Sequence, residues 1–441
     1  MPFGSSAIYQ VLPAHGALDA IVHVPGSKSI ANRALVCATL ADGMSVLRNV
    51  PGGDDTSAMS ECVAWLGAGV SPDPHDPTIV SVYGTSGVLR PGPMTLHTRL
   101  AGTTSRFVTA LCALGTGHYE IDGLPPLRER PMAPLHDALS ALGATVEPGD
   151  RPGHLPVVVH GIGVAARTSG VRRSLTRVSV RGDSSSQYLT ALMMIGPYLP
   201  GGLRIDLTTK LVSRPYVAIT AAVMARFGVS GVTIDDDAVV VPRGHYRAQD
   251  YVIEPDASSA SYPLAAAAIC GGKVKVAELG PDALQGDAAF ADVLASMGCA
   301  VERDASGTTV GRPHDLAGIA IDMADNSDLV PSLAAIAPFA TSPTEIRGVG
   351  FIRAKESDRI GMLARELRKC GITVIELDDG LRIEPGFSHG AALETYHDHR
   401  LAMAFGVMGL GLAGVRVHDP DVVSKSWPDF WTVLEGLRPS T

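Results

Sequence analysis

Residues 25–33 bring together side chains and backbone features that bind anions. The segment reads Pro-Gly-Ser-Lys-Ser-Ile-Ala-Asn-Arg and is followed by an apolar run. Ser29 and Arg33 are four positions apart and would share one face of a helix. Ser27 or Ser29 could cap that helix, whose free N–H groups and positive dipole end favour an anion. The segment predicts a phosphate or carboxylate site; from these residues alone, the alternative is a capped helix with a solvated Lys28 and Arg33.

Two further segments place glycine or hydroxyl groups in front of apolar helices. Gly102 and two threonines precede the expected helix 107–114, and a glycine there lets the backbone approach a ligand closely. Residues 182–187 (Gly-Asp-Ser-Ser-Ser-Gln) open the expected helix 188–195 with hydroxyls and an amide. A favourable N-cap explains the second segment equally well, so both interpretations stay open.

Residues 353–359 (Arg-Ala-Lys-Glu-Ser-Asp-Arg) are dense in charge. We expect a helix here, with Lys355 and Arg359 one turn apart on the same face and Glu356 on another. A carboxylate among cations can stay ionised or act as an acid, depending on its burial. The alternative is a surface helix stabilised by ion pairs.

Charged side chains also stand at two other expected helix starts. Asp328 comes just before the apolar run 331–340, where a carboxylate can cap a helix or act as a base. Residues 396–400 read Tyr-His-Asp-His-Arg and precede another apolar run. Three consecutive side chains of a regular helix cannot all point at one ion, so we expect Arg400 to bind an anion rather than a metal site here.

The composition places limits on the class of protein. At 441 residues the chain is long enough for two domains, and 46% hydrophobic with 18% charged residues is typical of a well-buried globular protein. A formal net charge of -9 argues against nucleic acid as a partner. No apolar run is long enough to span a bilayer, no secretory signal is evident, and the six cysteines are scattered. We therefore expect a soluble cytoplasmic protein with reduced thiols.

One pattern recurs along the chain: a helix ends in a glycine and a short β-branched strand follows. The glycines supply the left-handed residue that ends a helix, and their spacing predicts about six units, three in each domain. They are Gly67, Gly143, Gly228, Gly298 and Gly371. The sixth unit would end in a helix over residues 427–437.

Cations recur just before or at the start of helices in this repeat, at Arg130, Arg214, Lys355 and Lys425. If several helix N-termini converge, their dipoles and these cations would form one strongly positive cleft suited to an anionic ligand.

Taken in order, these segments resemble the 5-enolpyruvylshikimate-3-phosphate (EPSP) synthase family of enolpyruvyl transferases. The resemblance runs from residue 25 to about residue 430, and ten motifs in the same order are far more specific than any one of them. The motifs are 25–33, 101–103, 130–131, 185–187, 211–216, 256–262, 285–287, 355–359, 398–400 and 424–425.

The resemblance implies an inside-out α/β fold of two similar domains, each of three βαβαββ units, with the active site in the cleft between them. The N-terminal domain would be residues 26–255, and residues 1–25 and 256–441 would form the C-terminal domain. A first strand over residues 7–24 would belong to the C-terminal domain.

The reaction implied by the resemblance is transfer of the enolpyruvyl group of phosphoenolpyruvate to the 5-hydroxyl of shikimate-3-phosphate, with release of phosphate. It would proceed by addition and elimination through a tetrahedral intermediate, in chorismate and aromatic amino acid biosynthesis. Members need neither a metal nor an organic cofactor, and glyphosate occupies the phosphoenolpyruvate site. We expect a cytoplasmic monomer with these two small-molecule substrates and no nucleic-acid or membrane partner.

The family's site residues carry over to matching positions. Shikimate-3-phosphate would be bound by Lys28, Ser29, Arg33, Ser185, Ser186, Gln187, Ser213, Asp328 and Lys355. Phosphoenolpyruvate would be bound by Lys28, Gly102, Arg130, Gln187, Arg359, Arg400 and Lys425. In catalysis Asp328 would take the proton of the attacking hydroxyl and Glu356 would deliver one to the methylene carbon, with Lys28 as a third catalytic group.

The chain departs from the family pattern at four positions. Leu100 and His397 stand where many members have Asn, Phe351 replaces an Asn that contacts shikimate-3-phosphate in some members, and Phe107 replaces a common proline.

Two other functions remain to be tested. The sister enzyme that acts on UDP-N-acetylglucosamine usually carries a reactive Cys, in some members Asp, near residues 124–128, which read Leu-Pro-Pro-Leu-Arg here. An inert anion-binding or RNA-end-binding module would have no use for both Asp328 and Glu356.

Overall fold

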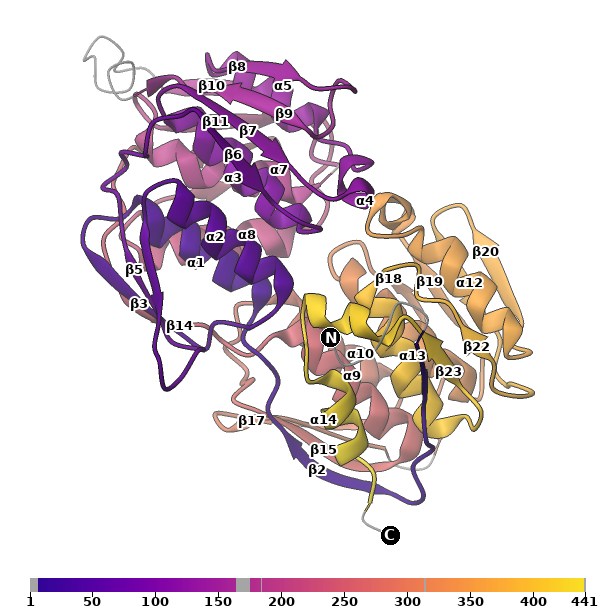
Figure 1. Cartoon of the computed structure of the whole chain (residues 1–441). Coiled ribbons are helices and arrows are strands. Elements are labelled where there is room, and N and C mark those ends of the chain that lie inside the picture. Colours follow the sequence, from indigo (N-terminus) through magenta and orange to yellow (C-terminus); the bar gives the residue numbers. More distant parts are fainter. Residues whose placement is uncertain (1–6, 164–174, 184, 313–314, 440–441) are drawn as a thin grey trace. The chain divides into compact units, whose positions relative to one another are not determined.

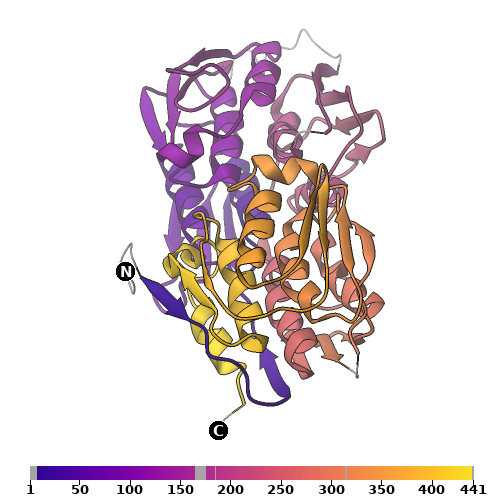
Figure 2. The ribbon, with the colours of Figure 1, turned by 90° about the vertical axis from the view of Figure 1, so that its right-hand side faces the viewer.

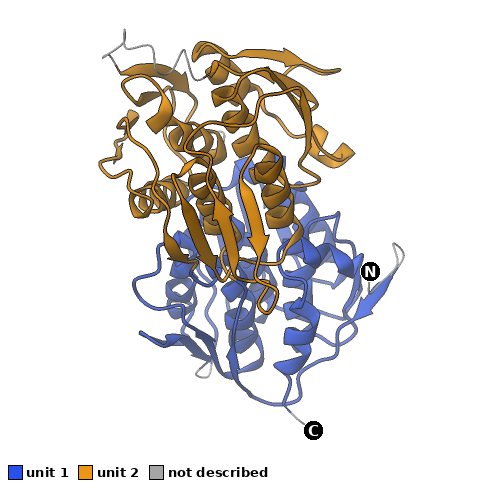
Figure 3. Cartoon of the chain, turned by 60° about the vertical axis from the view of Figure 1, so that its left-hand side comes forward, with its two compact units in different colours: residues 1–25, 254–441 blue, residues 26–253 orange. Residues whose placement is uncertain are grey.

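The structure is a computed structural model that describes residues 7–163, 175–183, 185–312 and 315–439. The chain divides into two compact units (Figure 3). Unit 1 contains residues 1–25 and 254–441, and unit 2 contains residues 26–253. The chain passes from one unit to the other at Pro25-Gly26, where a Cβ on Gly26 would lie 1.8 Å from the carbonyl oxygen of Asn49. A glycine is therefore required at this crossing.

Each sheet in the described chain repeats one pattern: two parallel strands, with antiparallel strands added to the second. Unit 2 has the sheets β14-β3-β5-β4, β6-β7-β9-β8 and β10-β11-β13-β12. Its strands are β3 Met44–Arg48, β4 Gly69–Pro72, β5 Val80–Tyr83, β6 Met94–His97, β7 His118–Asp122, β8 Thr145–Pro148, β9 Val157–His160, β10 Thr176–Val180, β11 Leu203–Leu207, β12 Thr233–Ile234, β13 Ala238–Val241 and β14 Asp250–Val252. Its helices are α1 Lys28–Leu40, α2 Asp54–Trp65, α3 Gly102–Leu114, α4 Pro125–Arg128, α5 Ala133–Ala141, α7 Ser186–Ile195, η1 Gly196–Tyr198 and α8 Arg214–Arg226.

Unit 1 repeats the pattern in the sheets β16-β17-β15-β2, β18-β19-β21-β20 and β1-β23-β22 (Figure 1). Its strands are β1 Ile8–Gln10, β2 Leu18–Val22, β15 Gly272–Ala277, β16 Ala300–Asp304, β17 Gly307–Arg312, β18 Ala320–Asp322, β19 Thr344–Arg347, β20 Val374–Leu377, β21 Gly380–Ile383, β22 Ala392–Leu393 and β23 Arg416–His418. Its helices are α9 Ala257–Cys270, η2 Gly286–Ala289, α10 Phe290–Ser296, η3 Ser327–Leu329, α11 Val330–Ile336, η4 Ala337–Phe339, η5 Gly350–Ala354, α12 Arg359–Lys369, α13 His399–Gly411, η6 Pro420–Lys425 and α14 Phe430–Gly436.

Strands distant in sequence complete the repeats. Just before the first crossing, β2 pairs in parallel with β15, and β14, just before the second crossing, pairs in parallel with β3. β1 pairs antiparallel with β23, and Figure 2 shows this indigo strand beside the yellow C-terminal segment. The expected single strand over residues 7–24 is therefore wrong: it is two strands in different sheets, because Pro13 and Gly16 (φ 109°) interrupt it.

The helix-ending glycines behave as predicted. Their φ angles are all positive, as the left-handed residue that ends a helix requires. The values are 111° for Gly67, 100° for Gly143, 95° for Gly228, 99° for Gly298 and 75° for Gly371.

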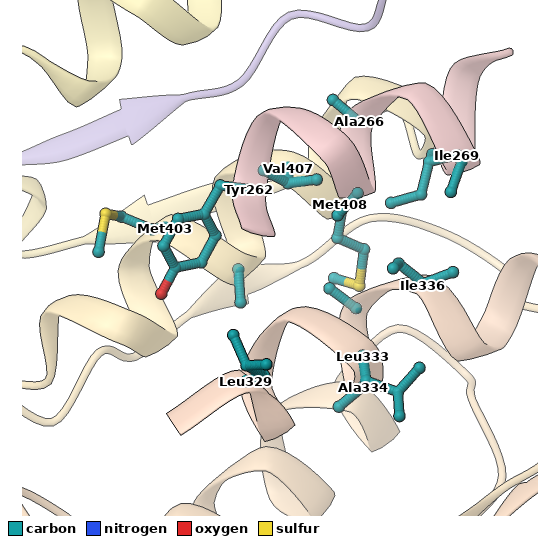
Figure 4. Close-up of a cluster of buried hydrophobic side chains, with 14 of the residues drawn as sticks. Tyr262, Ala266, Ile269, Leu329, Leu333, Ala334, Ile336, Met403, Val407 and Met408 are labelled. Carbon is teal, nitrogen blue, oxygen red and sulfur yellow. The ribbon is translucent and has the colours of Figure 1, made fainter. Parts of the chain in front are cut away.

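Apolar helices fix the positions of the helix starts within each unit. In unit 1, α9, α11 and α13 pack together through side chains such as Tyr262, Leu333 and Met408 (Figure 4). α9 is buried on all sides, as expected for a helix that is hydrophobic all round. In unit 2, α1, α3 and α7 occupy the equivalent place in a separate core. No helix among the described residues is long and apolar enough to cross a membrane.

Candidate active site

The start of α1 has the geometry that the first motif predicts. Ser27 is the N-cap, and its hydroxyl accepts a hydrogen bond from the N–H of Ile30 at 3.4 Å. Lys28 is the first helical residue, so Ser29 lies inside the helix and is not its cap. Arg33 lies one turn further on and donates through Nη1 to the carbonyl oxygen of Ser29 at 2.7 Å. The predicted shared face is confirmed.

Arg33 is a buried cation whose partners among the described residues are uncharged. Its side chain donates to the hydroxyls of Thr220 (2.9 Å) and Thr190 (3.3 Å) and to the carbonyl oxygen of Tyr216 (3.1 Å). Its guanidinium lies over the ring of Phe107 at 5.6 Å. The residue is 3% exposed, and burial lowers the pKa of Arg33 to about 10. A buried cation held without a carboxylate suits an anionic ligand.

Lys28 is held by an acidic residue that the sequence analysis did not single out. Its Nζ lies 3.0 Å from Oδ2 of Asp55, a buried residue in the first turn of α2. The hydroxyl of Thr104 in α3 donates to the carbonyl oxygen of Asp55 at 3.0 Å. The first turns of α1, α2 and α3 are thus tied together around one lysine.

Gly102 begins α3 against two arginines. A Cβ at this position would lie 2.5 Å from Nη1 of Arg130 and 2.8 Å from Nη1 of Arg106. Arg106 is 3% exposed and donates to the carbonyl oxygens of Gly102 (2.7 Å) and Pro131 (3.2 Å). The sequence analysis missed Arg106, although an arginine four residues after a ligand-facing glycine on one helix is a usable signal.

The remaining predicted residues of unit 2 lie at two helix starts. Ser185 is the N-cap of α7 and accepts from the N–H of Gln187 at 3.3 Å, so the N-cap interpretation holds. Oε1 of Gln187 is buried without a hydrogen-bond partner among the described residues, which leaves it available to a ligand. Ser186, the residue before Gln187, is also buried. Ser213 is a buried N-cap of α8 with φ 55°. Ser184 lies outside the described residues.

In unit 1, Asp328 is the centre of a cluster of cations. It lies in η3, directly before α11. Its Oδ1 accepts from Nζ of Lys355 at 2.9 Å and from Nη1 of Arg359 at 3.0 Å. Its Oδ2 accepts from Nη2 of Arg400 at 2.8 Å. The structure therefore brings together four residues from three separate segments of the sequence.

These cations control the protonation of Asp328. Burial raises the pKa of this carboxyl, but the charges of Arg400, Lys355 and Arg359 outweigh burial. The pKa of Asp328 is therefore held well below its usual range, and Glu356 opposes this only in part. While these cations contact it, Asp328 is ionised and only a weak base.

Arg359 links the carboxylates of the cluster. It is 1% exposed, and its Nη2 donates to Oε2 of Glu356 at 2.9 Å while its Nε donates to Oδ2 of Asp398 at 2.7 Å. The other carboxylate oxygen of Glu356 lies 3.6 Å from Nζ of Lys425. The two expected catalytic carboxylates, those of Asp328 and Glu356, thus share one guanidinium.

The expected helix over residues 353–359 is wrong, although the contacts it was meant to explain exist. α12 begins only at Arg359, because Asp358 is its N-cap and accepts from the N–H of Gly361 at 3.0 Å. Arg353 also binds the carboxylate of Asp358, which fixes the turn before the helix. Lys355 therefore reaches the site from a loop rather than from the helix face of Arg359.

Asp398, like Asp55 and Arg106, has a role that was not predicted from the sequence. It is fully buried, caps α13 through the N–H of Arg400 at 3.0 Å, and accepts from the hydroxyl of Ser357 at 3.1 Å. Because it also binds Arg359, it fixes two cations of the site relative to each other. The sequence does contain a signal for this role, because an aspartate directly before an apolar run is a typical N-cap.

The predicted concentration of positive charge is only partly present. In unit 1, the cations Lys355, Arg359, Arg400 and Lys425 contact the carboxylates of Asp328, Glu356 and Asp398. Arg214 at the start of α8 instead forms an exposed ion pair with Asp236 at 2.9 Å. Cations at equivalent points of the repeat therefore do not all serve the site.

Both units repeat one α/β architecture, and unit 1 holds an acid pair, Asp328 and Glu356, among cations. The structure is similar to EPSP synthase from Acinetobacter baumannii, with a TM-score of 0.81 at 23% identity and 98% of both chains covered. It is also similar to the enolpyruvyl transferase NikO from Streptomyces tendae, with a TM-score of 0.72 at 17% identity and the same coverage. These likenesses confirm the predicted fold class.

Sequence comparison identifies the family. A sequence model of EPSP synthase (3-phosphoshikimate 1-carboxyvinyltransferase) matches residues 13–434. The 3-phosphoshikimate 1-carboxyvinyltransferase of Nostoc punctiforme is 43% identical over 416 residues, 94% of this chain and 95% of that protein. That of Methanoculleus marisnigri is 39% identical over 423 residues, 96% of this chain and 97% of that protein.

The chain therefore belongs to the EPSP synthase family. Its reaction is the transfer of the enolpyruvyl group of phosphoenolpyruvate to shikimate-3-phosphate, in aromatic amino acid biosynthesis. The predicted activity is confirmed.

Proposed function

We propose that this transfer uses ligands from both units. In the proposal, Lys28, Ser29, Arg33, Ser185, Ser186, Gln187 and Ser213 of unit 2 and Asp328 and Lys355 of unit 1 bind shikimate-3-phosphate. Gly102 and Arg130, with Lys28 and Gln187, bind phosphoenolpyruvate from unit 2, and Arg359, Arg400 and Lys425 bind it from unit 1. The observation that carries the proposal is the cluster in which one guanidinium, that of Arg359, joins two carboxylates. A binding module would need the cations but not this acid pair.

In this proposal, the negative charge of the substrates makes Asp328 a stronger base when they bind. The two substrates carry roughly five to six negative charges near neutral pH, since phosphate has a second pKa of about 6. In unit 1 these anions compete with Asp328 for Lys355 and Arg400. As substrate phosphate and carboxylate groups take up these cations, the pKa of Asp328 rises toward the range of a useful base.

The proton transfers balance over the two steps. In the addition, Asp328 accepts the proton of the 5-hydroxyl, whose oxygen bonds to C2 of phosphoenolpyruvate, while Glu356, which is protonated when this step begins, gives its proton to C3. In the elimination, Glu356 takes a proton back from C3 as the C2–O bond to phosphate breaks. Asp328 returns its proton to the departing phosphate, so both carboxyls recover their starting states. Lys28 stabilises the negative charge that develops on that phosphate.

The deciding assay is phosphate release from phosphoenolpyruvate that depends on shikimate-3-phosphate, with UDP-N-acetylglucosamine as the control acceptor. We expect release with the first acceptor and none with the second. Residues 124–128 support this choice, since this segment contains α4 and neither cysteine nor aspartate. Release only with the nucleotide sugar would overturn the proposal in favour of the sister activity, and release with neither would favour the inert binding module.

We further propose that the enzyme works in the cytoplasm as a monomer. All six cysteines are free thiols, and five of them are buried, which suits a reducing compartment. Light scattering after gel filtration should give a mass near 45.9 kDa. A mass twice as large would contradict the monomer, and recovery with a membrane or periplasmic fraction would contradict the compartment.

A further inference from the structure

A chain of polar contacts connects Asp328 to a buried acid outside the set of ligands. Nη2 of Arg400, which binds Asp328, also lies 3.5 Å from the hydroxyl oxygen of Ser258 in the first turn of α9. That hydroxyl donates a hydrogen bond to Oδ2 of Asp287 in η2. Asp287 is 4% exposed and Ser258 is 7% exposed. Neither residue has a role in the mechanism above.

The surrounding backbone fixes this pair. Asp256 caps α9 by accepting from the N–H groups of Ser258 (2.9 Å) and Ser259 (3.3 Å). Gln285, just before η2, accepts from the N–H of Ala257 at 3.1 Å and donates to the carbonyl oxygen of Pro255 at 2.7 Å. These hydrogen bonds fix the start of α9 relative to the start of η2. The backbone therefore holds Ser258 and Asp287 in hydrogen-bonding positions.

Asp287 determines which way the Ser258 hydroxyl points. A hydroxyl has a single hydrogen, and an ionised carboxylate can only accept. With the hydrogen directed to Asp287, the oxygen of Ser258 presents lone pairs to Arg400, whose N–H groups can only donate. If Asp287 were protonated it could donate to Ser258 itself, and the serine hydrogen would then be free to turn toward Arg400.

The protonation of Asp287 falls in a pH range that enzyme assays can cover, because of the charges around it. Burial and the charge of Asp328 raise the pKa of Asp287 to about 6, and Asp256 adds to this. The hydroxyl of Ser258 and the charge of Arg400 act in the opposite direction. On α10, which packs against η2, the charged side chain is Asp292, which is exposed and paired with Arg303 of β16 at 2.9 Å.

We propose that Asp287 and Ser258 are positioning residues that orient the guanidinium of Arg400 toward phosphoenolpyruvate. The inference rests on the proposed function, in which Arg400 binds that substrate. Asp287 acts on Arg400 through the serine hydroxyl and touches neither the substrate nor the reacting atoms. Its effect should therefore fall on the KM for phosphoenolpyruvate, and the KM for shikimate-3-phosphate should stay unchanged.

The test compares wild type with Asp287→Asn and Ser258→Ala, using steady-state phosphate release between pH 5 and pH 8. At pH 7.5 we expect either substitution to raise the KM for phosphoenolpyruvate about three- to tenfold, the usual range for one hydrogen bond. The double variant should be no worse than the poorer single variant, because both changes break the same link. Asp292→Asn removes one exposed carboxylate nearby and is the matched control, with wild-type KM expected.

The pH profile separates positioning from a merely structural role. We compare the KM for phosphoenolpyruvate of Asp287→Asn with that of the wild type as a ratio. Titration of the substrate's own phosphate affects both values equally and therefore cancels. We expect this ratio to fall toward one below pH 6, where wild-type Asp287 is itself protonated. A ratio that stays constant across the range, or that equals one throughout, overturns the proposal.

Failure of the underlying function is recognised separately. A wild-type enzyme without phosphate release dependent on shikimate-3-phosphate contradicts the proposed function before any variant is compared. If Asp287→Asn does not fold, judged by thermal unfolding, Ser258→Ala decides alone. A wild-type KM for phosphoenolpyruvate in a folded Ser258→Ala then overturns the proposal.

Discussion

Substitution of Gly102 by alanine should weaken ligand binding far more than it weakens the fold. The added methyl carbon would lie 2.5 Å from Nη1 and 2.9 Å from Cζ of Arg130, closer than non-bonded carbon contacts allow. It would also lie 2.8 Å from Nη1 of Arg106. Arg106 is buried, donates to two backbone carbonyls and lies over the ring of Tyr188 at 5.4 Å, so its guanidinium has little room to move. The guanidinium of Arg130 must move instead, and Arg130 is a proposed ligand of phosphoenolpyruvate.

The size of the effect follows from the cost of this displacement. Overpacking by one methyl typically costs about 1–3 kcal/mol. That corresponds to roughly 5- to 150-fold weaker binding, because about 1.4 kcal/mol is a factor of ten. Glyphosate is longer than phosphoenolpyruvate, so its binding should weaken more than that of the substrate. The ratio of the glyphosate Ki to the phosphoenolpyruvate KM should therefore rise in Gly102→Ala.

The assay is steady-state phosphate release at saturating shikimate-3-phosphate, with glyphosate varied against phosphoenolpyruvate at matched ratios of substrate to KM. We expect competitive inhibition in the wild type. Gly52→Ala is the control, since a Cβ there meets nothing within 4 Å. If Gly102→Ala is inhibited as readily as wild type, then Gly102 does not line the phosphoenolpyruvate site and the placement of Arg130 is wrong.

Three further predictions concern catalysis, ligand binding and stability. Glu356→Gln and Asp328→Ala should each lower kcat about 10²- to 10⁴-fold, more than they affect binding, as is usual for a positioned acid or base; wild-type turnover in a folded variant would remove that residue from its role. Shikimate-3-phosphate with glyphosate should reduce the radius of gyration in solution scattering, because the proposed ligands come from both units; identical curves with and without ligands would count against this. Burial lowers the pKa of His136 to about 4, with His154 and Arg106 adding to the shift, against about 6.5 unfolded. Its stabilising contribution is complete above pH 6.5, is lost as pH falls toward 4, and amounts to up to about 3 kcal/mol. His136→Leu should thus flatten the decline of Tm over this pH range, and an unchanged decline would contradict the argument.

Features governed by neighbouring residues could be predicted from the sequence. The positive φ angles at Gly67 and Gly371 follow from local rules for ending a helix, and so does the cap at Ser27. Local rules also place Arg33 one turn from Ser29. These assignments need no knowledge of the rest of the chain.

Features governed by distant residues could not be predicted in this way. The break between β1 and β2 depends on which sheet accepts each strand, and their partners β23 and β15 lie hundreds of residues away. The start of α12 at Arg359, rather than at residue 353 as expected, depends on how Arg353 binds Asp358, which competes with helical geometry. Arg106 was overlooked because it lies within an apolar helix, where only the fold shows that it reaches the carbonyl oxygen of Pro131.

The partners of the cations are the most consequential of these distant features. Residue types along the chain predict a positive site, but Arg359 is enclosed by carboxylates from three separate segments, at Asp328, Glu356 and Asp398. The positive and negative charges of this site therefore nearly cancel, and this balance has a consequence for function. In the proposed mechanism, an anionic substrate that binds Lys355 and Arg400 displaces the carboxylate of the proposed base, Asp328, from these cations. Binding and the gain of basicity at Asp328 are then one electrostatic event, so the base is strongest only when both substrates are in place.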